Sequence, residues 1–347
     1  MRNFRKVLLV SISFLLLVGI MSLAIMEAYI HFEYAFDEDV RLRRDLAGEI
    51  DYIFLGASHI QQALIPKEVD EALGVNSYIL ADGWQSIPLS RTMLETELAR
   101  NPVKEVVLDV TFSTMTRTGE SDSVERDLYA LPRLENEAQR LDHIRKTFKP
   151  KGYKKVFILY MQYGSEYLIK KVLGKNVKNV IDENKGFKEM PARNLLLKGE
   201  KIGKTYNSDV LNNKWRKQNT EGLADIINLC KQKDIKVSIV VVPVSQQKIW
   251  QNDGWDVFHS QLQEYCLYND VAMVDFNLLK ERFELFDEET SFSNSEHLCT
   301  KGAKEFTPVY CRIMKQINEG KDISDQFYDS YEEMKQHTIY AESISKN

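Results

Sequence analysis

The chain has 347 residues, 44% of them apolar and 28% charged, which is enough for one large domain or two small ones with a sizeable core. Its net charge of −5 argues against a nucleic-acid partner, because nucleic-acid binding usually requires a basic face.

Residues 1–36 predict a membrane anchor. The run from Val7 to Ile30 carries no charge before Glu27, and about 20 apolar residues are enough to cross a bilayer. Arg2, Arg5 and Lys6 precede the run, and basic residues on this short side favour a cytoplasmic N-terminus. We therefore expect a single-pass signal anchor in the cell membrane, with the rest of the chain extracytoplasmic. A cleaved signal peptide is the alternative, although Ser22-Leu23-Ala24 is a weak cleavage match.

Apolar runs rich in Val and Ile then alternate with helical patterns. The runs that predict buried parallel strands are Tyr52–Leu55, Ser77–Leu80, Val106–Val110, Val237–Val242 and Val271–Val274. The predicted helices are Pro66–Leu73, Leu89–Ala99, Gly222–Lys231, Asp256–Leu267 and Lys301–Ile317. This alternation is typical of βαβ units, so we predict an α/β fold with a parallel sheet over residues 37–318.

Residues from about 117 to 220 interrupt the alternation and predict a helical insertion between the third and fourth strands. Glu125–Thr147 predicts one helix, and Val156–Val172 predicts a second helix with an aromatic face. Three roles are open for this insertion: a lid over the site, docking on the membrane surface, or simple packing against the main domain. Residues 319–347 are polar and predict a solvated tail or a loosely docked helix.

The four cysteines all lie in the last third of the chain, at Cys230, Cys266, Cys299 and Cys311. We interpret them as buried free thiols rather than disulfides, because a domain of this size needs no covalent staples. His297 and Cys299 match no zinc-binding spacing, so we predict no metal site.

Ser58 and His297 are the candidate catalytic residues. Ser58 follows the first predicted strand within Gly56-Ala57-Ser58, and His297 precedes the last predicted helix. A serine hydroxyl becomes a useful nucleophile at neutral pH only with a base within hydrogen-bond reach. The carboxyl ends of parallel strands meet at one edge of the sheet, so these two residues are expected to converge there. Each also has a structural alternative, because serine and histidine can simply cap the helices that follow them.

The segments after the second and third strands should reach the same edge of the sheet. The first reads Asp82-Gly83-Trp84-Gln85-Ser86, and the second reads Asp109-Val110-Thr111-Phe112-Ser113. Acyl transfer needs donors aimed at the developing oxyanion, and we assign this role to the backbone N–H groups of Ser58 and Gly83. The candidate substrate-lining residues are His59, Asp82, Trp84 and Gln85. The His59 side chain is expected to point away from the nucleophile.

With these residues in place, the chain resembles the SGNH/GDSL-type hydrolases, in the membrane-anchored branch that includes DltD and the polysaccharide O-acetyltransfer proteins. The resemblance covers about residues 50–115 and 223–317. It implies a three-layer α/β/α fold with a flavodoxin-like parallel sheet. It also implies that Gly56-Ala57-Ser58 carries the nucleophile, that Gly83 supplies an oxyanion donor, and that Asn294 and His297 stand where the family has its acid and base.

The chain departs from this family at two places. The segment after the third strand, Asp109 to Ser113, contains no asparagine to act as a further oxyanion donor. Asn294 stands where the family has aspartate, and an amide cannot supply the negative charge that stabilises imidazolium. Three explanations are open: a Ser-His dyad, a substitute carboxylate at Glu296 or Asp275, or a site that binds without reacting.

The resemblance implies an extracytoplasmic O-acyltransferase or esterase that needs no cofactor. Its substrate would be an acyl ester on a cell-envelope glycan or teichoic-type polymer, and a multi-spanning membrane acyltransferase is a candidate partner. The alternative is a degenerate scaffold or polymer-binding protein beside such an acyltransferase. A nucleotide-binding role is a weaker reading, because the turn after the first strand lacks a Gly-x-Gly-x-x-Gly pattern.

Overall fold

The computed structural model describes residues 2–31, 34–83, 85–116, 125, 127–148, 150–173, 184–193, 215, 217–251 and 254–339. The chain divides into two compact units. Residues 1–45 and 119–182 form the first unit, and residues 46–118 and 183–347 form the second. The helical insertion predicted from the sequence therefore contributes to both units.

The second unit is built on a five-stranded parallel sheet with the order β2-β1-β3-β4-β5. The strands are β1 (Tyr52–Ala57), β2 (Ser77–Asp82), β3 (Glu105–Asp109), β4 (Lys236–Val241) and β5 (Ala272–Asp275). This order is that of flavodoxin-like sheets, and the α/β fold class predicted from the sequence is confirmed. All five strands lie where their apolar runs predict them.

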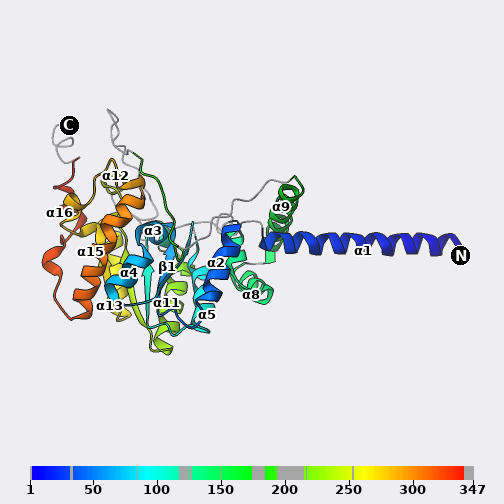
Figure 1. The fold of residues 1–347 in the computed structure, drawn as a ribbon, viewed down its shortest axis with the longest axis horizontal. Helices are drawn as coiled ribbons and strands as arrows, with labels where there is room; N and C mark the ends of the chain where they lie inside the picture. The colour runs from blue at the N-terminus through cyan, green and yellow to red at the C-terminus, as the bar shows by residue number, and fades with distance from the viewer. Residues whose placement is uncertain are drawn as a thin grey trace. The chain divides into compact units, whose positions relative to one another are not determined.

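Helices cover both faces of this sheet (Figure 1). On one face α4 (Pro66–Leu73) packs against α15 (Thr300–Asn318), and on the other face α5 (Ile87–Leu98) packs against α11 (Lys217–Gln232). Helix α13 (Trp255–Tyr268) packs on β5. The shorter elements of this unit are α3 (Ser58–Ala63), α6 (Phe112–Thr116), α12 (Gln246–Trp250), η3 (Phe276–Leu278), α14 (Arg282–Leu285), η4 (Ser324–Gln326) and α16 (Tyr331–Lys335).

The core of the second unit lies between the sheet and α15. Phe54 of β1 and Phe306 and Tyr310 of α15 are fully buried within it. The Tyr310 hydroxyl is 2.9 Å from the Tyr52 hydroxyl, so this aromatic core also satisfies its polar atoms. The four cysteines are buried with free thiols, as the sequence interpretation favoured.

Segment 319–339 contains more structure than its polar sequence suggests. Tyr331 of α16 is fully buried, and its hydroxyl donates to Asp275 at 2.8 Å. The ring of Tyr331 also stacks on Trp255 of α13, with centroids 5.1 Å apart. These contacts attach α16 to the end of β5.

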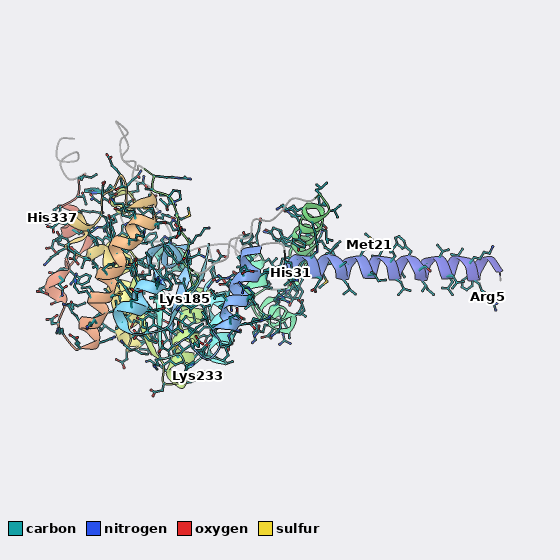
Figure 2. The ribbon with its side chains drawn as sticks, viewed as in Figure 1. Arg5, Met21, His31, Lys185, Lys233 and His337 are labelled. Atoms are coloured by element: carbon teal, nitrogen blue, oxygen red, sulfur yellow. The ribbon has the colours of Figure 1, made fainter. Side chains whose placement is uncertain are left out.

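The first unit combines the N-terminal helix with helices from the insertion. Its elements are α1 (Arg2–Ile30), α2 (Tyr34–Asp45), η1 (Leu131–Arg133), α8 (Glu137–Thr147), η2 (Pro150–Gly152) and α9 (Tyr153–Val172). Most apolar side chains of α1 are exposed, and Figure 2 shows the side chains of Arg5 and Met21 pointing outward from the helix. Within this unit, Asp39 lies between Arg43 and Arg133 in a buried ion-pair cluster.

The predicted single helix over Glu125–Thr147 was wrong. The described residues after Ala130 form the turn η1, and α8 begins only at Glu137. Pro132 lies in this turn, where its ring and missing N–H disfavour a continuing helix. Asn136 then caps α8, its side-chain oxygen accepting from Gln139 N–H at 2.9 Å.

Candidate active site

The site lies at the carboxyl edge of the sheet in the second unit, where the strand order reverses. From β1 the chain passes to β2 on one side and returns to β3 on the other. Ligands of open α/β sheets bind at such a switch point. Ser58 is the first residue after β1, so the sheet presents its hydroxyl at this point.

Ser58 and His297 meet although 239 positions separate them. Ser58 Oγ lies 2.7 Å from His297 Nε2, well within the 2.6–3.2 Å range typical of a nucleophile and its base. Both side chains are half-buried, which leaves the pair accessible from solvent. The convergence expected from the sequence is therefore present in the structure.

A tight hairpin sets the position of His297. Asn294 ends β6 (Phe292–Asn294) and pairs with His297, which begins β7 (His297–Leu298). The turn between them is anchored from the loop after β4, where Ser245 Oγ donates to the Ser295 carbonyl at 2.9 Å. Ser245 N–H donates to the same oxygen at 3.1 Å. The sequence places His297 next to the last helix, but it did not predict this hairpin or its anchor.

The Asn294 amide determines which nitrogen of His297 carries the proton. Its Oδ1 accepts from the backbone N–H of Glu296 at 2.9 Å, which fixes the orientation of the amide because an N–H can only donate. The same Oδ1 lies 2.8 Å from His297 Nδ1, so Nδ1 must carry the proton. Nε2 is then the unprotonated nitrogen, and it can accept the proton of Ser58 Oγ–H.

His59 packs on the ring of His297. The two imidazoles stack with centroids 4.5 Å apart and an angle of 22° between their planes, and His59 is buried. The expectation that the His59 side chain points away from the nucleophile was therefore wrong. Ser58 begins α3 directly after β1, and this turn brings the next side chain over the base.

The segment after β2 lies beside Ser58, because Asp82 is the register partner of Ala57. Gly83 N–H donates to Asp82 Oδ1 at 2.6 Å, so this proposed oxyanion donor is engaged by a carboxylate. Gln85 is buried, and its amide donates to Leu80 O and Ser90 Oγ at 2.9 Å each, a placement that suits support of the turn. Trp84 lies outside the described residues.

Asp109 ends β3 opposite Gly56 and is buried beneath the edge of the sheet. A Cβ on Gly56 would lie 3.0 Å from Asp109 Cβ, so glycine permits this close approach. Asp109 Oδ1 accepts from Val242 N–H at 3.5 Å, while Oδ2 has no hydrogen-bond partner among the described residues. Burial raises the pKa of this carboxyl to about 7, against the opposing effect of the hydrogen bond from Val242.

The two carboxylates considered as substitutes for aspartate have other partners. Asp275 accepts from Tyr331 and binds His259 Nδ1 at 3.0 Å, near the end of β5. Glu296 forms an ion pair with Lys248. The side chain hydrogen-bonded to His297 Nδ1 is that of Asn294.

Comparisons with known proteins add little to this geometry. No protein-family model matches the chain, and no curated protein matches it. Among solved structures, it is similar to a protein from Bacteroides fragilis described provisionally as an acylhydrolase. The two share 8% identity over 81% of this chain and 94% of the other, with a TM-score of 0.35. A likeness this distant defines neither the family nor the activity of the chain.

Proposed function

We propose that this chain is a membrane-anchored serine acyl-ester enzyme, an SGNH-type O-acyltransferase or esterase. The observation that carries the proposal is the hydrogen-bonded chain Ser58–His297–Asn294 at the switch point of a parallel sheet. It supplies a nucleophile, a base in the correct tautomer and a residue that orients the base.

In the proposed reaction, Ser58 Oγ attacks the acyl carbonyl carbon and His297 Nε2 takes the hydroxyl proton. Collapse of the tetrahedral intermediate leaves the acyl group on Ser58 and transfers the proton from His297 to the departing alcohol oxygen. A second hydroxyl, from water or an acceptor polymer, then gives its proton to His297 and attacks the acyl-enzyme. Ser58 recovers its proton from His297 as the ester bond to Oγ breaks.

The oxyanion would be held by the backbone N–H of Ser58, joined by that of Gly83. Gly83 N–H becomes available when the Asp82 carboxylate turns away from it, so substrate entry would have to displace this contact. His59 supports the base from the other side, because its ring limits the orientations that His297 can adopt.

We infer that α1 anchors the chain and that the site faces away from the cytoplasm. Residues Phe4–Ile30 form a helix long and apolar enough to cross a membrane, and the basic residues precede it. The end of this helix is packed, since Tyr29 is fully buried and stacks on Tyr160 of α9 with centroids 3.9 Å apart. A cell-envelope glycan or teichoic-type polymer is the proposed substrate on the strength of the family resemblance.

The test is hydrolysis of p-nitrophenyl acetate by the full-length chain in detergent. Ser58→Ala should abolish turnover, and His297→Ala should lower it by about 10²–10⁴-fold, the usual contribution of a general base. His59→Ala should cost about two- to tenfold, the value of a ring stack, and His59→Phe should recover most of the loss. Ser295→Ala, in the same hairpin, is the matched control. Wild-type turnover in Ser58→Ala would refute the proposal.

A second candidate function is a scaffold or polymer-binding protein that partners a membrane acyltransferase. Two observations favour it: an amide stands where a carboxylate would stabilise imidazolium, and Asp82 engages the N–H of Gly83. In that case the folded wild-type chain would hydrolyse the ester no faster than Ser58→Ala.

A further inference from the structure

Helix α9 carries two apolar faces, and its packing inside the first unit accounts for one of them. The packed face holds Val156, Leu159, Tyr160 and Gly164, all buried. The second face, here called the α9 stripe, consists of Phe157, Ile158, Met161, Leu168, Ile169 and Val172. Phe157, Ile158 and Ile169 are at least half exposed, and Val172 is 85% exposed. Helices that are apolar around most of their circumference are normally buried on every side.

The contact between α9 and α1 fixes the level of α9 along the anchor. A Cβ on Gly164 would lie 2.0 Å from the carbonyl oxygen of Ile25, so the two helices touch backbone to backbone at this point. The exposed apolar residues of α1 run from Phe4 to Leu23, a rise of about 29 Å at 1.5 Å per residue. That length matches the hydrocarbon core of a bilayer, about 30 Å. The Ile25 contact therefore lies at the boundary between acyl chains and headgroups.

The orientation of α9 at this level turns its stripe toward the membrane. Tyr160 packs on Tyr29, and Gly164 packs on Ile25, one turn closer to the N-terminus of α1. At about 100° per residue, Gly164 lies between Tyr160 and the stripe on the circumference of α9. Rotation about the α9 axis in the direction from Tyr160 to Gly164 leads next to Phe157 and Leu168. The stripe therefore faces the N-terminal part of α1, where the apolar side chains are exposed. Figure 1 shows α9 lying across α1 near the C-terminal end of α1 and not along it.

The ends of α9 carry charges that suit a lipid surface. Lys154 and Lys155 lie in the first turn, and Lys170 and Lys171 lie in the last. Amphipathic helices that lie in the interface combine apolar residues with lysines that reach the headgroups. Tyrosines, of which α9 has four, are enriched at the same level of membrane proteins.

We propose that α9 lies along the headgroup boundary of the bilayer crossed by α1, with the α9 stripe inserted among the acyl chains. The proposal rests on the membrane anchoring inferred for α1 and is independent of the esterase chemistry. The occupant of the stripe is lipid, and a membrane protein at this face is the competing outcome of the test.

The test places an environment-sensitive fluorophore on α9 of the full-length chain in vesicles of phosphatidylcholine and phosphatidylglycerol. Phe157→Cys and Val172→Cys carry the probe on the stripe, and Glu166→Cys carries it on the exposed polar face of the same helix. The four native thiols are buried, and wild-type chain labelled in parallel measures their background. The highly exposed Val172 position guards against a folding defect in Phe157→Cys.

The stripe probes should emit further to the blue, be quenched by nitroxide-labelled lipid and be shielded from iodide, while the Glu166 probe shows the reverse. Stripe probes as open to iodide as the Glu166 probe, on chain that stays with the vesicles, would overturn the lipid proposal alone and favour a protein partner. Chain that leaves the vesicles, or whose intact mass shows that residues 1–24 were removed, would overturn the anchoring and this proposal together. Neither result bears on ester hydrolysis, which is measured separately.

Discussion

At the scale of single residues, Asn294 is the side chain that most limits the proposed chemistry. Its oxygen orients His297 and fixes the tautomer, but a neutral amide does not stabilise the imidazolium that forms when Ser58 gives up its proton. A site built this way is oriented for catalysis but has a weakened base.

Asn294→Asp should therefore raise ester turnover. An aspartate oxygen can keep both hydrogen bonds that Asn294 Oδ1 accepts, from Glu296 N–H and His297 Nδ1–H, and adds the missing charge. In serine proteases the reverse change lowers kcat about 10⁴-fold, so an increase of at least about tenfold is expected here. The measurement is kcat on p-nitrophenyl acetate, with Asn294→Ala as the control that loses orientation. Equal turnover in wild type and Asn294→Asp would show that Asn294 does not assist the base.

The sequence predicted the nucleophile and its base because each stands beside an element with a clear pattern: a buried strand before Ser58 and an amphipathic helix after His297. It did not predict the stacking of His59, since that depends on the turn angle between β1 and α3. Nor did it show that Asp82 engages Gly83 N–H, because a rotamer choice decides that contact.

At the scale of elements, strands were easier to predict than helix ends. The five strands are continuous apolar runs because both faces of a parallel sheet are covered by helices. The break after Ala130 was missed although Pro132 and the capping residue Asn136 are both visible in the sequence. The hairpin that carries Asn294 and His297 has only five strand residues, and its anchor comes from Ser245, about 50 positions away.

The close contact between α9 and α1 predicts that a larger residue at Gly164 destabilises the chain. Gly164→Ala would place a Cβ 2.0 Å from the Ile25 carbonyl, so the helices must separate, at a typical overpacking cost of about 1–3 kcal/mol. This should exceed the gain of about 1 kcal/mol that alanine brings to a helix interior. Gly152→Ala is the control, because its Cβ would meet Phe148 at an ordinary 3.7 Å. Thermal unfolding in detergent should show a loss for Gly164→Ala only. A Gly164→Ala chain as stable as Gly152→Ala would contradict the packing described.

At the scale of the whole molecule, one buried carboxyl links stability to pH. Asp109 has a pKa of about 7 in the folded chain because burial disfavours its charge, whereas an unfolded aspartate titrates near 3.9. The folded state therefore binds more protons between these values. The contribution of Asp109 to the stability of the folded state is fully present below about pH 4 and is lost as pH rises through 7.

Asp109→Asn removes this titration while keeping the shape of the side chain. The melting temperature of the variant should rise relative to that of wild type as pH increases from 5 to 9. The two plots of melting temperature against pH should converge toward acid pH. Thermal melts of both chains across this range are the measurement. Curves that stay parallel from pH 5 to pH 9 would mean that Asp109 keeps an ordinary pKa in the folded state.

The proposed function depends most on Ser58 being a nucleophile activated by His297, and a covalent probe tests this directly. Folded full-length chain is treated with a fluorophosphonate, and the modified residue is located by peptide mass. We predict one adduct on Ser58, no adduct in Ser58→Ala and strongly slowed labelling in His297→Ala. A folded wild-type chain that stays unmodified, or that is modified at another residue, would contradict the account.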